Sequence, residues 1–535
     1  MSSVAGYPGN RNTSFFRFSP RSHRADTIHW RSWGEVAFQE AVQQDKPIFL
    51  VISSSWCEWC HIMDETTLSE PTIITILNKD FIPIRVDSDM RPDVNARYNQ
   101  KGWPSVAMLS AEGELLWGGV YVPPKQMLYY LGHIRRYYSE HRQEIIEQAS
   151  QVQIERTTRS LTHTLPALTP SPSEEPISLN HVPGEAGSVL QDLYDSEHGG
   201  FAIHPHLKFP HPEALEFLLL LSNSECCTAN EVNILREIVN YSLEQMHEGG
   251  LWDKEAGGFF RYSAASDWSA PHTEKMLEEN AALLRLTLLT ASVTQEQRWY
   301  DLAQRLLLYI NTHLWLPEPG IFAGSQCADE AYYEPGLYSH TLEEAPPVDT
   351  TVYTAWNAQM ISSYLLAARL LKRPSLGTAA LNALNWLCQH MISPIGSAYH
   401  YAVYTQGELA GQLTDQVWLV HVLLDAYEYQ GSADYLTMAQ KLTKTCREEL
   451  YNEQSGLFYD IPHDAHAVGR LATQTHPLTE NALAAENLLH LAKVTENQEM
   501  REMGERVLMR CLEQYRRTGI QGATYARVVL QSRSM

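Results

Sequence analysis

The sequence predicts an α/β domain followed by an all-α domain that is built from paired helices. In the N-terminal region, residues 1–157, apolar runs of strand type alternate with helical patterns. In the C-terminal region, residues 184–535, turns that combine glycine with an aromatic residue recur every 58 to 76 residues, and two long helical patterns lie between successive turns. The Pro- and Ser-rich residues 158–183 show no periodicity, so we predict a linker there.

The predicted elements of the N-terminal region follow a definite order. Helices are predicted over residues 33–44, from 57, after Pro71, from Pro92 and over 124–140, and strands over 48–52, 81–86, 105–109 and 114–117. A parallel strand–helix–strand unit therefore precedes an antiparallel hairpin and a closing helix. This is the order of the thioredoxin-like fold.

Two cysteines lie where the first predicted strand meets the next helix. Cys57 and Cys60 form a C-x-x-C motif directly after the apolar run. A thiol in the first turn of a helix faces unpaired N–H groups and the positive end of the helix dipole, which stabilise a thiolate. Cys60 lies on the same helix face and can resolve a mixed disulfide. The motif therefore predicts a thiol–disulfide redox site.

Three other interpretations of these cysteines remain open. With His61 the motif spells C-x-x-C-H, which is also the attachment signature of c-type haem. Haem attachment requires export, and Met1–Asn10 lack the charged and apolar regions of a signal peptide. Zinc needs about four ligands, and no second C-x-x-C is present. In the third interpretation the cysteines are buried and inert. We predict no metal and no cofactor.

Pro104 is predicted to complete the redox site. It follows Trp103 and precedes the strand over residues 105–109. In thioredoxin-like folds a cis-proline at this place packs against the C-x-x-C motif and exposes backbone for substrate pairing. A cis X-Pro bond is a minority state that needs tertiary support. A trans proline that opens an edge strand is the alternative.

Composition limits the partners and the compartment. The chain has 535 residues, which suits two or three domains, and its net charge of −23 argues against nucleic acid and anionic membranes as partners. No apolar run approaches the ~18 residues of a membrane span. The 8 cysteines are mostly scattered singly, which is typical of a reducing compartment, so we expect a cytoplasmic protein.

Six glycine-aromatic turns predict the architecture of the C-terminal region. They are Gly199-Gly200-Phe201, Gly257-Gly258-Phe259, Gly320-Ile321-Phe322, Gly396 to Tyr399, Gly456-Leu457-Phe458 and Gly522 to Tyr525. Glycine permits positive φ and close approach of neighbouring chains in such turns. A helix pair repeated around six turns predicts an (α/α)6 barrel whose glycine loops gather at one mouth. A curved α-solenoid has the same signature but leaves both ends open.

Several motifs recur in one known family. They are Cys57 to Met63 preceded by Asp45-Lys46-Pro47, His29 to Phe38, Val86-Asp87, Arg91-Pro92-Asp93, Gly102-Trp103-Pro104, Lys208-Phe209-Pro210, Gly257 to Ser263, Pro271 to Asn280, and Trp356-Asn357. Together they resemble the YyaL-type thioredoxin-domain proteins, whose animal members are called spermatogenesis-associated proteins. The resemblance covers nearly the whole chain. It implies a thioredoxin-like domain fused to a six-hairpin barrel like those of glycosidases and N-acylglucosamine epimerases, and it implies no particular reaction.

Two features depart from the expected redox pattern. The family usually has histidine where this chain has Glu58, and a carboxylate beside Cys57 disfavours its thiolate. The strand over residues 48–52 also lacks the buried acid that thioredoxins place before the C-x-x-C motif. Because that acid assists proton transfer from the resolving thiol, we expect slow turnover as a reductase.

Candidate ligand-binding residues follow the glycine turns. Sugar-processing (α/α)6 barrels use carboxylates or histidines at the mouth, with aromatic rings for stacking. The candidates are Arg261, Asp267, Trp268, His272 and Glu274 after the second turn, Asp349, Trp356 and Asn357 after the third, Asp415 and Trp418 after the fourth, and Glu480 and Asn481 after the fifth. In a barrel these repeats converge on one cavity. Each residue taken alone also fits a packing tryptophan or a helix cap.

Two functions from different classes follow. In the first, the protein is a redox module that exchanges with a protein thiol or disulfide, and its barrel selects that partner or a small sugar-like ligand. In the second, it is a carbohydrate-active enzyme, a hydrolase or an epimerase, with a regulatory or structural thioredoxin-like domain. A low pKa of Cys57 favours the first, and a sugar bound in the barrel favours the second.

Overall fold

The chain divides into two compact units. The computed structural model describes residues 16–148, 151, 178–330, 332–333, 345–403 and 405–533. The first unit comprises Met1–His163 together with His463–Gln474, and the second comprises Thr164–Pro462 together with Thr475–Met535. Residues 158–177 of the predicted linker lie outside the described residues.

The first unit is built around a four-stranded sheet of order β2-β1-β3-β4. Its strands are β1 (Ile48–Ser53), β2 (Ile82–Asp87), β3 (Ser105–Leu109) and β4 (Leu115–Val120). β1 pairs in parallel with β2, whereas β3 is antiparallel to both β1 and β4. Every residue of β1 is buried, because helices cover both faces of the sheet, and this explains its unbroken apolar run.

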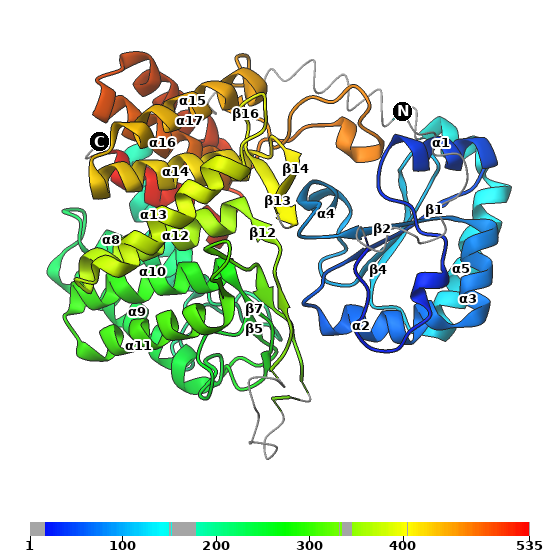
Figure 1. The fold of residues 1–535 in the computed structure, drawn as a ribbon, viewed down its shortest axis with the longest axis horizontal. Helices are drawn as coiled ribbons and strands as arrows, with labels where there is room; N and C mark the ends of the chain where they lie inside the picture. Colours follow the sequence, from blue (N-terminus) through cyan, green and yellow to red (C-terminus); the bar gives the residue numbers. More distant parts are fainter. Residues whose placement is uncertain are drawn as a thin grey trace, which may run out of the picture. The chain divides into compact units, whose positions relative to one another are not determined.

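In the described part of this unit, the helices α1 to α5 surround the sheet. They are α1 (Glu35–Gln44), α2 (Glu58–Glu65), α3 (Pro71–Asp80), α4 (Pro92–Tyr98) and α5 (Pro124–Glu140). Side chains of α3 and α5 form a core on one face, and side chains of α1 and α4 form a second core on the other. Figure 1 shows the sheet with its helices around it. Proline begins α3, α4 and α5, where its fixed φ suits the first helical turn. The predicted thioredoxin-like order is confirmed.

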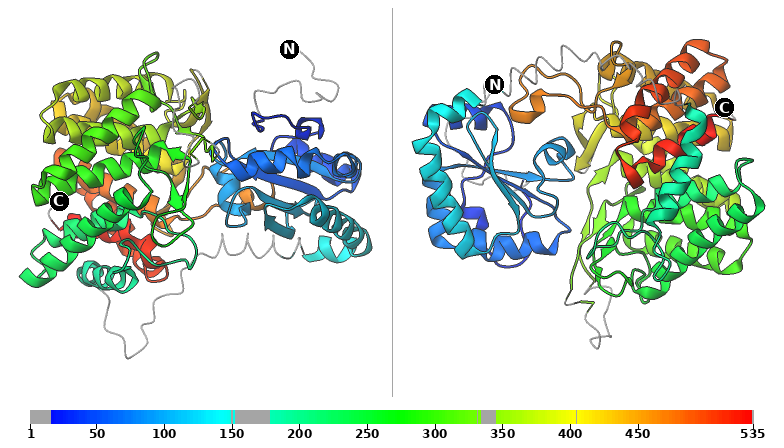
Figure 2. Two further views of the ribbon diagram at one scale, coloured as in Figure 1. Left: turned by 90° about the horizontal axis from the view of Figure 1, so that it is seen from below. Right: turned by 180° about the vertical axis from the view of Figure 1, so that it is seen from behind.

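The second unit is a closed ring of helix pairs (Figures 1 and 2). The inner helices are α8 (Pro212–Ser222), α10 (Leu277–Thr294), α12 (Thr354–Leu370), α14 (Leu413–Gln430), α16 (Leu478–Thr495) and α18 (Ala523–Ser532). The outer helices are α7 (Val182–Leu193), α9 (Ala229–Gly249), α11 (Gln297–Tyr309), α13 (Pro374–His390), α15 (Ala433–Leu450) and α17 (Gln498–Tyr515). Each inner helix packs against the next, and α18 returns to α8 and pairs with α7. The closed (α/α)6 barrel is therefore confirmed over the solenoid.

The first five glycine turns are antiparallel hairpins, but the sixth prediction is wrong. In the five hairpins the glycine before the aromatic position has positive φ, as at Gly200, Gly258 and Gly320. Gly522 instead has a φ of −78° and leads directly into α18. The connection from α17 to α18 is short and turns three residues earlier, at Gly519 with a φ of 54°, through a 3₁₀ helix. No hairpin is needed there.

An amide side chain fixes four of these hairpins to the helix that follows. The amides are Asn280, Asn357, Gln416 and Asn481, each the fourth residue of its inner helix. Each accepts from the backbone N–H and donates to the C=O of one hairpin residue, and the four hairpin residues are Phe259, Phe322, Ala398 and Phe458. These bonds satisfy backbone groups that are buried. We call these four side chains the amide staples.

No helix in the described ranges is both long enough and apolar enough to cross a bilayer.

Candidate functional sites

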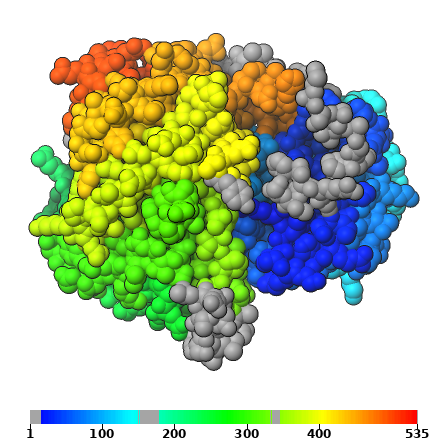
Figure 3. All heavy atoms as spheres, in the orientation of Figure 1, coloured from blue at the N-terminus to red at the C-terminus, as the bar shows by residue number. Residues whose placement is uncertain are grey.

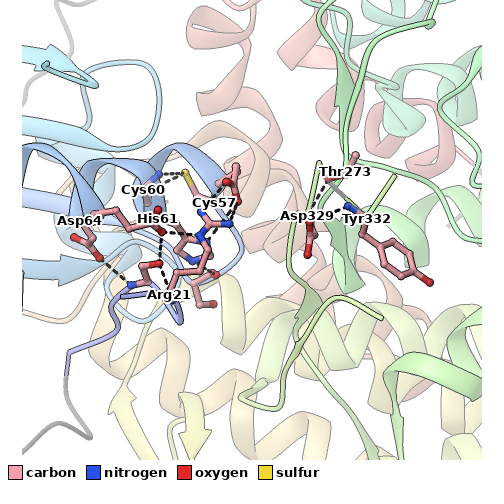
Figure 4. Close-up of polar contacts among 12 residues, drawn as sticks. Arg21, Cys57, Cys60, His61, Asp64, Thr273, Asp329 and Tyr332 are labelled. Atoms are coloured by element: carbon pink, nitrogen blue, oxygen red, sulfur yellow. Dashed lines mark hydrogen bonds and ion pairs between the residues drawn. The ribbon is translucent and has the colours of Figure 1, made fainter. Parts of the chain in front are cut away.

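Cys57 and Cys60 lie together at the start of α2 (Figure 4). Cys57 is the N-cap residue, and its Sγ accepts the backbone N–H of Cys60 at 3.2 Å. The two sulfur atoms are 2.6 Å apart, with the Cys60 thiol donating to Cys57. Cys57 is 6% exposed and Cys60 is 2% exposed. Cys57 therefore lies at the helix N-terminus, the position that the sequence predicted for it.

Cys60 has the opposite electrostatic environment. Burial raises the pKa of its thiol well above the usual value, and the hydrogen bond to Cys57, the charge of Cys57 and the nearby Asp64 add to this effect. A thiol with a raised pKa stays protonated at neutral pH. Cys60 is thus suited to donate to the Cys57 sulfur and to attack only after Cys57 has been consumed in a mixed disulfide.

The Glu58 carboxylate is engaged by its own partners. Arg21 donates to it at 2.7 Å and also binds Glu65, while His61 Nδ1 lies 3.8 Å from it (Figure 4). Burial raises the pKa of Glu58, but the neighbouring His61 and Arg21 side chains outweigh burial and leave the pKa below its usual value. The positive charge of Arg21 thus pairs with the negative charge of Glu58. No pattern in the sequence predicts Arg21 as this partner.

A buried acid near Cys60 comes from the helix rather than from the strand. Asp64, one turn after Cys60, is 1% exposed, and the Arg85 guanidinium donates to both of its oxygens at 2.8 Å. The Ser19 backbone N–H donates to the same carboxylate. A carboxylate held in this bidentate way is poorly placed to take a proton from Cys60. Slow turnover as a reductase stays a prediction.

The proline loop closes the site on its other side. The Trp103–Pro104 bond is cis, as predicted, and the Pro104 carbonyl accepts the N–H of Tyr121. The Trp103 ring packs edge-on against Trp56, with 5.6 Å between centroids. The ring of Trp59, inside the C-x-x-C motif, is 44% exposed beside Tyr121. An aromatic surface thus adjoins the cysteines. Within the described residues, no three His, Cys, Asp or Glu side chains are grouped as metal ligands.

Three of the predicted residues after the second glycine turn, Arg261, His272 and Glu274, form one cluster. Arg261 lies 3.8 Å from Glu274 and 3.4 Å from Glu279. Burial raises the pKa of Glu274 to about 7, although Arg261 lowers it. His272 stacks on Tyr262 at 4.3 Å, and burial followed by the charge of Arg261 lowers its pKa. This cluster joins a carboxyl that titrates near neutrality to an arginine.

The structure places other candidates in packing or capping positions. Trp268 is fully buried, and its Nε1 donates to the His198 carbonyl. Asp267 is exposed and accepts from Ser269. Trp356 packs on Tyr353 with 4.3 Å between ring centroids, and Asn357 is an amide staple. Asp415 is fully buried, and its carboxylate accepts the Ala355 N–H and a hydrogen bond from His400 Nδ1 at 2.7 Å. A binding role for these residues stays a prediction.

A cavity of about 470 Å³ lies inside the ring of inner helices. All six inner helices contribute to its wall, through Glu213, Glu216, Glu278, Arg285, Gln359, Ser362, Thr414, Trp418, His421, Thr479, Glu480, Thr524 and Arg527 among others. These residues belong mainly to the first three turns of their helices. The volume falls in the range of small-molecule sites, roughly 300–1,000 Å³. Of the candidates from the sequence, Trp418 and Glu480 belong to this wall.

Ion pairs hold the charged groups of the cavity wall. Arg285 donates to Glu216 at 3.0 Å, and Arg527 donates to both oxygens of Glu486 at 2.7 and 2.8 Å. His421 lies 3.9 Å from the Glu486 carboxylate. Both arginines are therefore neutralised, and the further carboxylates of the wall make it acidic. Burial raises the pKa of Glu480.

Most residues of the cavity wall are not among the predicted candidates, because they lie within helices rather than in the loops after the glycine turns. The missed residues are single charged or polar side chains inside otherwise apolar helices, such as Glu216, Arg285, His421 and Arg527. A charge within an apolar helix is rarely fully buried without a partner. Such isolated charges were the signal that could have predicted an internal polar cavity.

The fold and these sites define a protein with a C-x-x-C thioredoxin-like domain followed by an (α/α)6 barrel. Residues 14–156 match the sequence model of the DsbH-like thioredoxin family, described as a protein of unknown function, DUF255. The chain is 24% identical to human spermatogenesis-associated protein 20, across 82% of this chain and 69% of that protein. It is 28% identical to the mouse protein of the same name, across 73% of this chain and 48% of that protein. These matches confirm the resemblance found in the sequence.

Solved structures match the barrel. A cellobiose 2-epimerase from Bacillus thermoamylovorans superposes with a TM-score of 0.51 at 12% identity, covering 64% of this chain and 87% of the epimerase. A D-mannose isomerase superposes with a TM-score of 0.51 at 10% identity, covering 62% and 84%. At this identity the likeness establishes the fold alone.

Proposed function

We propose that the thioredoxin-like domain exchanges thiols and disulfides, with Cys57 as the attacking residue. The observation that carries this proposal is the pair of free sulfurs 2.6 Å apart, with Cys57 at the N-cap of α2. The helix N-terminus favours a thiolate at Cys57. The loop with cis-Pro104 leads into β3, the strand that pairs with β1. No cysteine of the described chain is joined in a disulfide, which supports a reducing compartment such as the cytoplasm.

The exchange is balanced in two steps. The Cys57 thiolate attacks one sulfur of a partner disulfide, which forms a mixed disulfide and releases the other sulfur as a thiolate. Cys60 then loses its proton and attacks Cys57 Sγ, which forms the Cys57–Cys60 disulfide and releases the second partner sulfur as a thiol. Two electrons pass to the partner, and an external thiol must reduce the domain again. The partner is a protein disulfide or a low-molecular-weight disulfide.

Trapping of the mixed disulfide tests this proposal. Cys60→Ser in the full chain should accumulate a covalent adduct with oxidised glutathione or insulin, because the resolving thiol is absent. Cys57→Ser should form no such adduct under the same conditions. Cys388→Ser is the control for loss of an unrelated thiol. An adduct that depends on Cys60 rather than Cys57, or no adduct with either disulfide, would refute the assignment.

We propose, as a second function, that the barrel binds a neutral sugar or polyol in its internal cavity. Carboxylates and hydroxyls of the wall can hold sugar hydroxyls, and the Trp418 ring can cover an apolar sugar face. The paired arginines and the surplus of carboxylates disfavour an anionic ligand. The likeness of the barrel fold to a cellobiose 2-epimerase and a D-mannose isomerase supports this ligand class.

Calorimetric titration with neutral mono- and disaccharides tests the barrel proposal. Trp418→Ala should weaken binding at least about tenfold, as expected for the loss of one stacking partner of ~1.4 kcal/mol. Leu308→Ala, on the exposed face of an outer helix, is the control. Binding that is lost in Trp356→Ala but kept in Trp418→Ala would place the ligand at the mouth instead. Turnover of a bound sugar that Glu480→Gln abolishes would favour the carbohydrate-active enzyme.

A further inference from the structure

A segment from the barrel part of the sequence belongs to the thioredoxin-like unit. Residues 463–474 lie between the fifth glycine hairpin and α16, yet they pack with the first unit. Leu471 is 7% exposed and shares the core of α1 and α4, where it joins Trp33 and Phe38. In the space-filling view the orange atoms of this part of the chain border blue atoms of the N-terminal domain (Figure 3). We call residues 463–474 the clasp.

The clasp makes reciprocal hydrogen bonds with the last turn of α4. Arg97 donates to the carbonyls of Arg470 at 3.2 Å and Thr473 at 3.0 Å. Arg470 in turn donates from its guanidinium to the Arg97 carbonyl at 3.3 Å, and from its backbone to the Tyr98 hydroxyl at 2.7 Å. The Arg470 side chain thus caps the Arg97 carbonyl, one of those that the end of a helix leaves without an internal partner.

Two glycines allow this close approach. A Cβ placed on Gly469 would lie 2.4 Å from the Tyr98 hydroxyl, and a Cβ on Gly113 would lie 2.7 Å from the Gly469 Cα. Gly469 also has a φ of 58°, which favours glycine. The Tyr98 hydroxyl donates to the Gly113 carbonyl at 2.9 Å, so one hydroxyl joins the clasp, α4 and the β3–β4 turn. These short distances indicate that the clasp is specifically packed against α4 and the β3–β4 turn rather than lying loosely on a surface.

The end of α4 leads directly to the proline loop of the redox site. Asn99, the C-cap of α4, accepts the Gly102 N–H at 3.0 Å, and the Gln100 side chain donates to the Tyr98 carbonyl at 2.7 Å. Trp103 and Pro104 follow at once, and the Trp103 ring contacts Trp56, the neighbour of Cys57. A displacement of the last turn of α4 would therefore shift the loop that flanks the cysteines.

We propose that the clasp is a positioning element for the redox site, which acts through α4 and the proline loop. The proposal rests on the thiol chemistry proposed for Cys57. It assigns residues 463–474, which follow a barrel hairpin in sequence, to the folding and tuning of the thioredoxin-like unit.

Matched glycine substitutions in the full chain test the proposal. Gly469→Ala introduces both the clash and the positive-φ strain, whereas Gly519→Ala introduces a similar φ of 54° with no atom within 4 Å of the new Cβ. Arg470→Ala is the milder variant, since it keeps the backbone bonds and removes the cap of α4. Two quantities are measured in each variant: hydrogen–deuterium exchange of residues 92–98, and the rate of Cys57 alkylation by iodoacetamide as a function of pH.

In Gly469→Ala and Arg470→Ala we expect exchange over residues 92–98 to rise about tenfold or more, and the pH profile of Cys57 alkylation to move. Gly519→Ala should change neither. Exchange in residues 92–98 that matches the control would show that the clasp does not hold α4. Faster exchange with an unmoved alkylation profile would show that α4 does not position Cys57, and either result overturns the proposal. Alkylation needs no disulfide partner, so both measurements stay valid even where no exchange activity is found.

Discussion

Lys275 shows how a single charge is accommodated inside the barrel. It is fully buried, and its Nζ donates to Asp253 at 2.6 Å and to the Gly257 carbonyl at 2.8 Å. The rings of Phe260 and Tyr309 lie 4.9 and 4.6 Å from the same nitrogen. Burial lowers the pKa of Lys275 to about 8, although Asp253 raises it. Lys275 and its ion pair with Asp253 thereby stabilise the second glycine turn, which contains Gly257.

Lys275→Met should destabilise the barrel by ~3–5 kcal/mol, because it leaves the Asp253 carboxylate buried without its counter-charge. The measurement is the free energy of the barrel unfolding transition in urea. Lys254→Met removes an exposed lysine of the same turn and should change this free energy of unfolding by less than about 0.5 kcal/mol. Equal effects of the two variants would contradict the structural role of the pair.

Glu274 should make stability depend on pH. Its pKa is about 7 in the folded chain against an ordinary value of 4.5 for a glutamate, so the folded state binds the proton more tightly. Stability should fall as pH rises from about 4.5 to about 7, by about 3 kcal/mol for this group, and stay level outside that window. Glu274→Gln should flatten this part of the profile. Asp267→Asn, at an exposed carboxyl, should leave the decline in place.

Cys60 should limit the second step of exchange. Because burial raises its pKa well above 9, only a small fraction is thiolate at neutral pH, and that fraction grows about tenfold per pH unit. With an aromatic disulfide reagent, full-chain protein should release one coloured thiolate from the Cys57 attack and a second, slower one whose rate rises with pH. Cys60→Ser should lack the second phase, and a second phase independent of pH would count against this assignment.

At the scale of helices and strands, sequence pattern predicted the elements that have one clear period. The helix over residues 124–140 has the bounds of α5, and the apolar run over 48–52 is β1. The five hairpins could be predicted because each has a backbone position with positive φ, which favours glycine and is therefore visible in the sequence. The clasp left no such mark, since it arises where residues distant in sequence meet, and the cavity left only isolated charges inside apolar helices. Arg21 at Glu58 and Arg470 at α4 depend on tertiary contact alone.

The amide staples should contribute measurably to the stability of the glycine hairpins. Asn357→Ala should leave the N–H and C=O of Phe322 unsatisfied in a buried setting, at a cost of about 3 kcal/mol to the barrel. Amide exchange of Ile321 and Phe322 should rise while that of α5 in the first unit stays unchanged. Asn230→Ala, an exposed asparagine of α9, is the control. Unchanged stability of Asn357→Ala would show that the hairpin holds without its staple.

At the scale of the whole molecule, the apolar cores are separate. The two clusters of the thioredoxin-like unit share no residue with the large cluster of the barrel among the described residues, and the clasp contributes Leu471 to the first unit. Chains with separate cores usually unfold in more than one step. We therefore expect two unfolding transitions in calorimetry of the full chain.

Core substitutions should move these transitions one at a time. Leu286→Ala, at a fully buried position of α10, should lower only the barrel transition, and Phe49→Ala in β1 should lower only the other, each by ~2–5 kcal/mol. Oxidation of Cys57 and Cys60 should likewise move only the transition that Phe49→Ala moves, since both cysteines lie in that unit. A single transition that both substitutions lower would show that the units unfold together. Gly469→Ala would then identify the cause, because loosening the clasp should split that transition in two if residues 463–474 are the element that couples the cores.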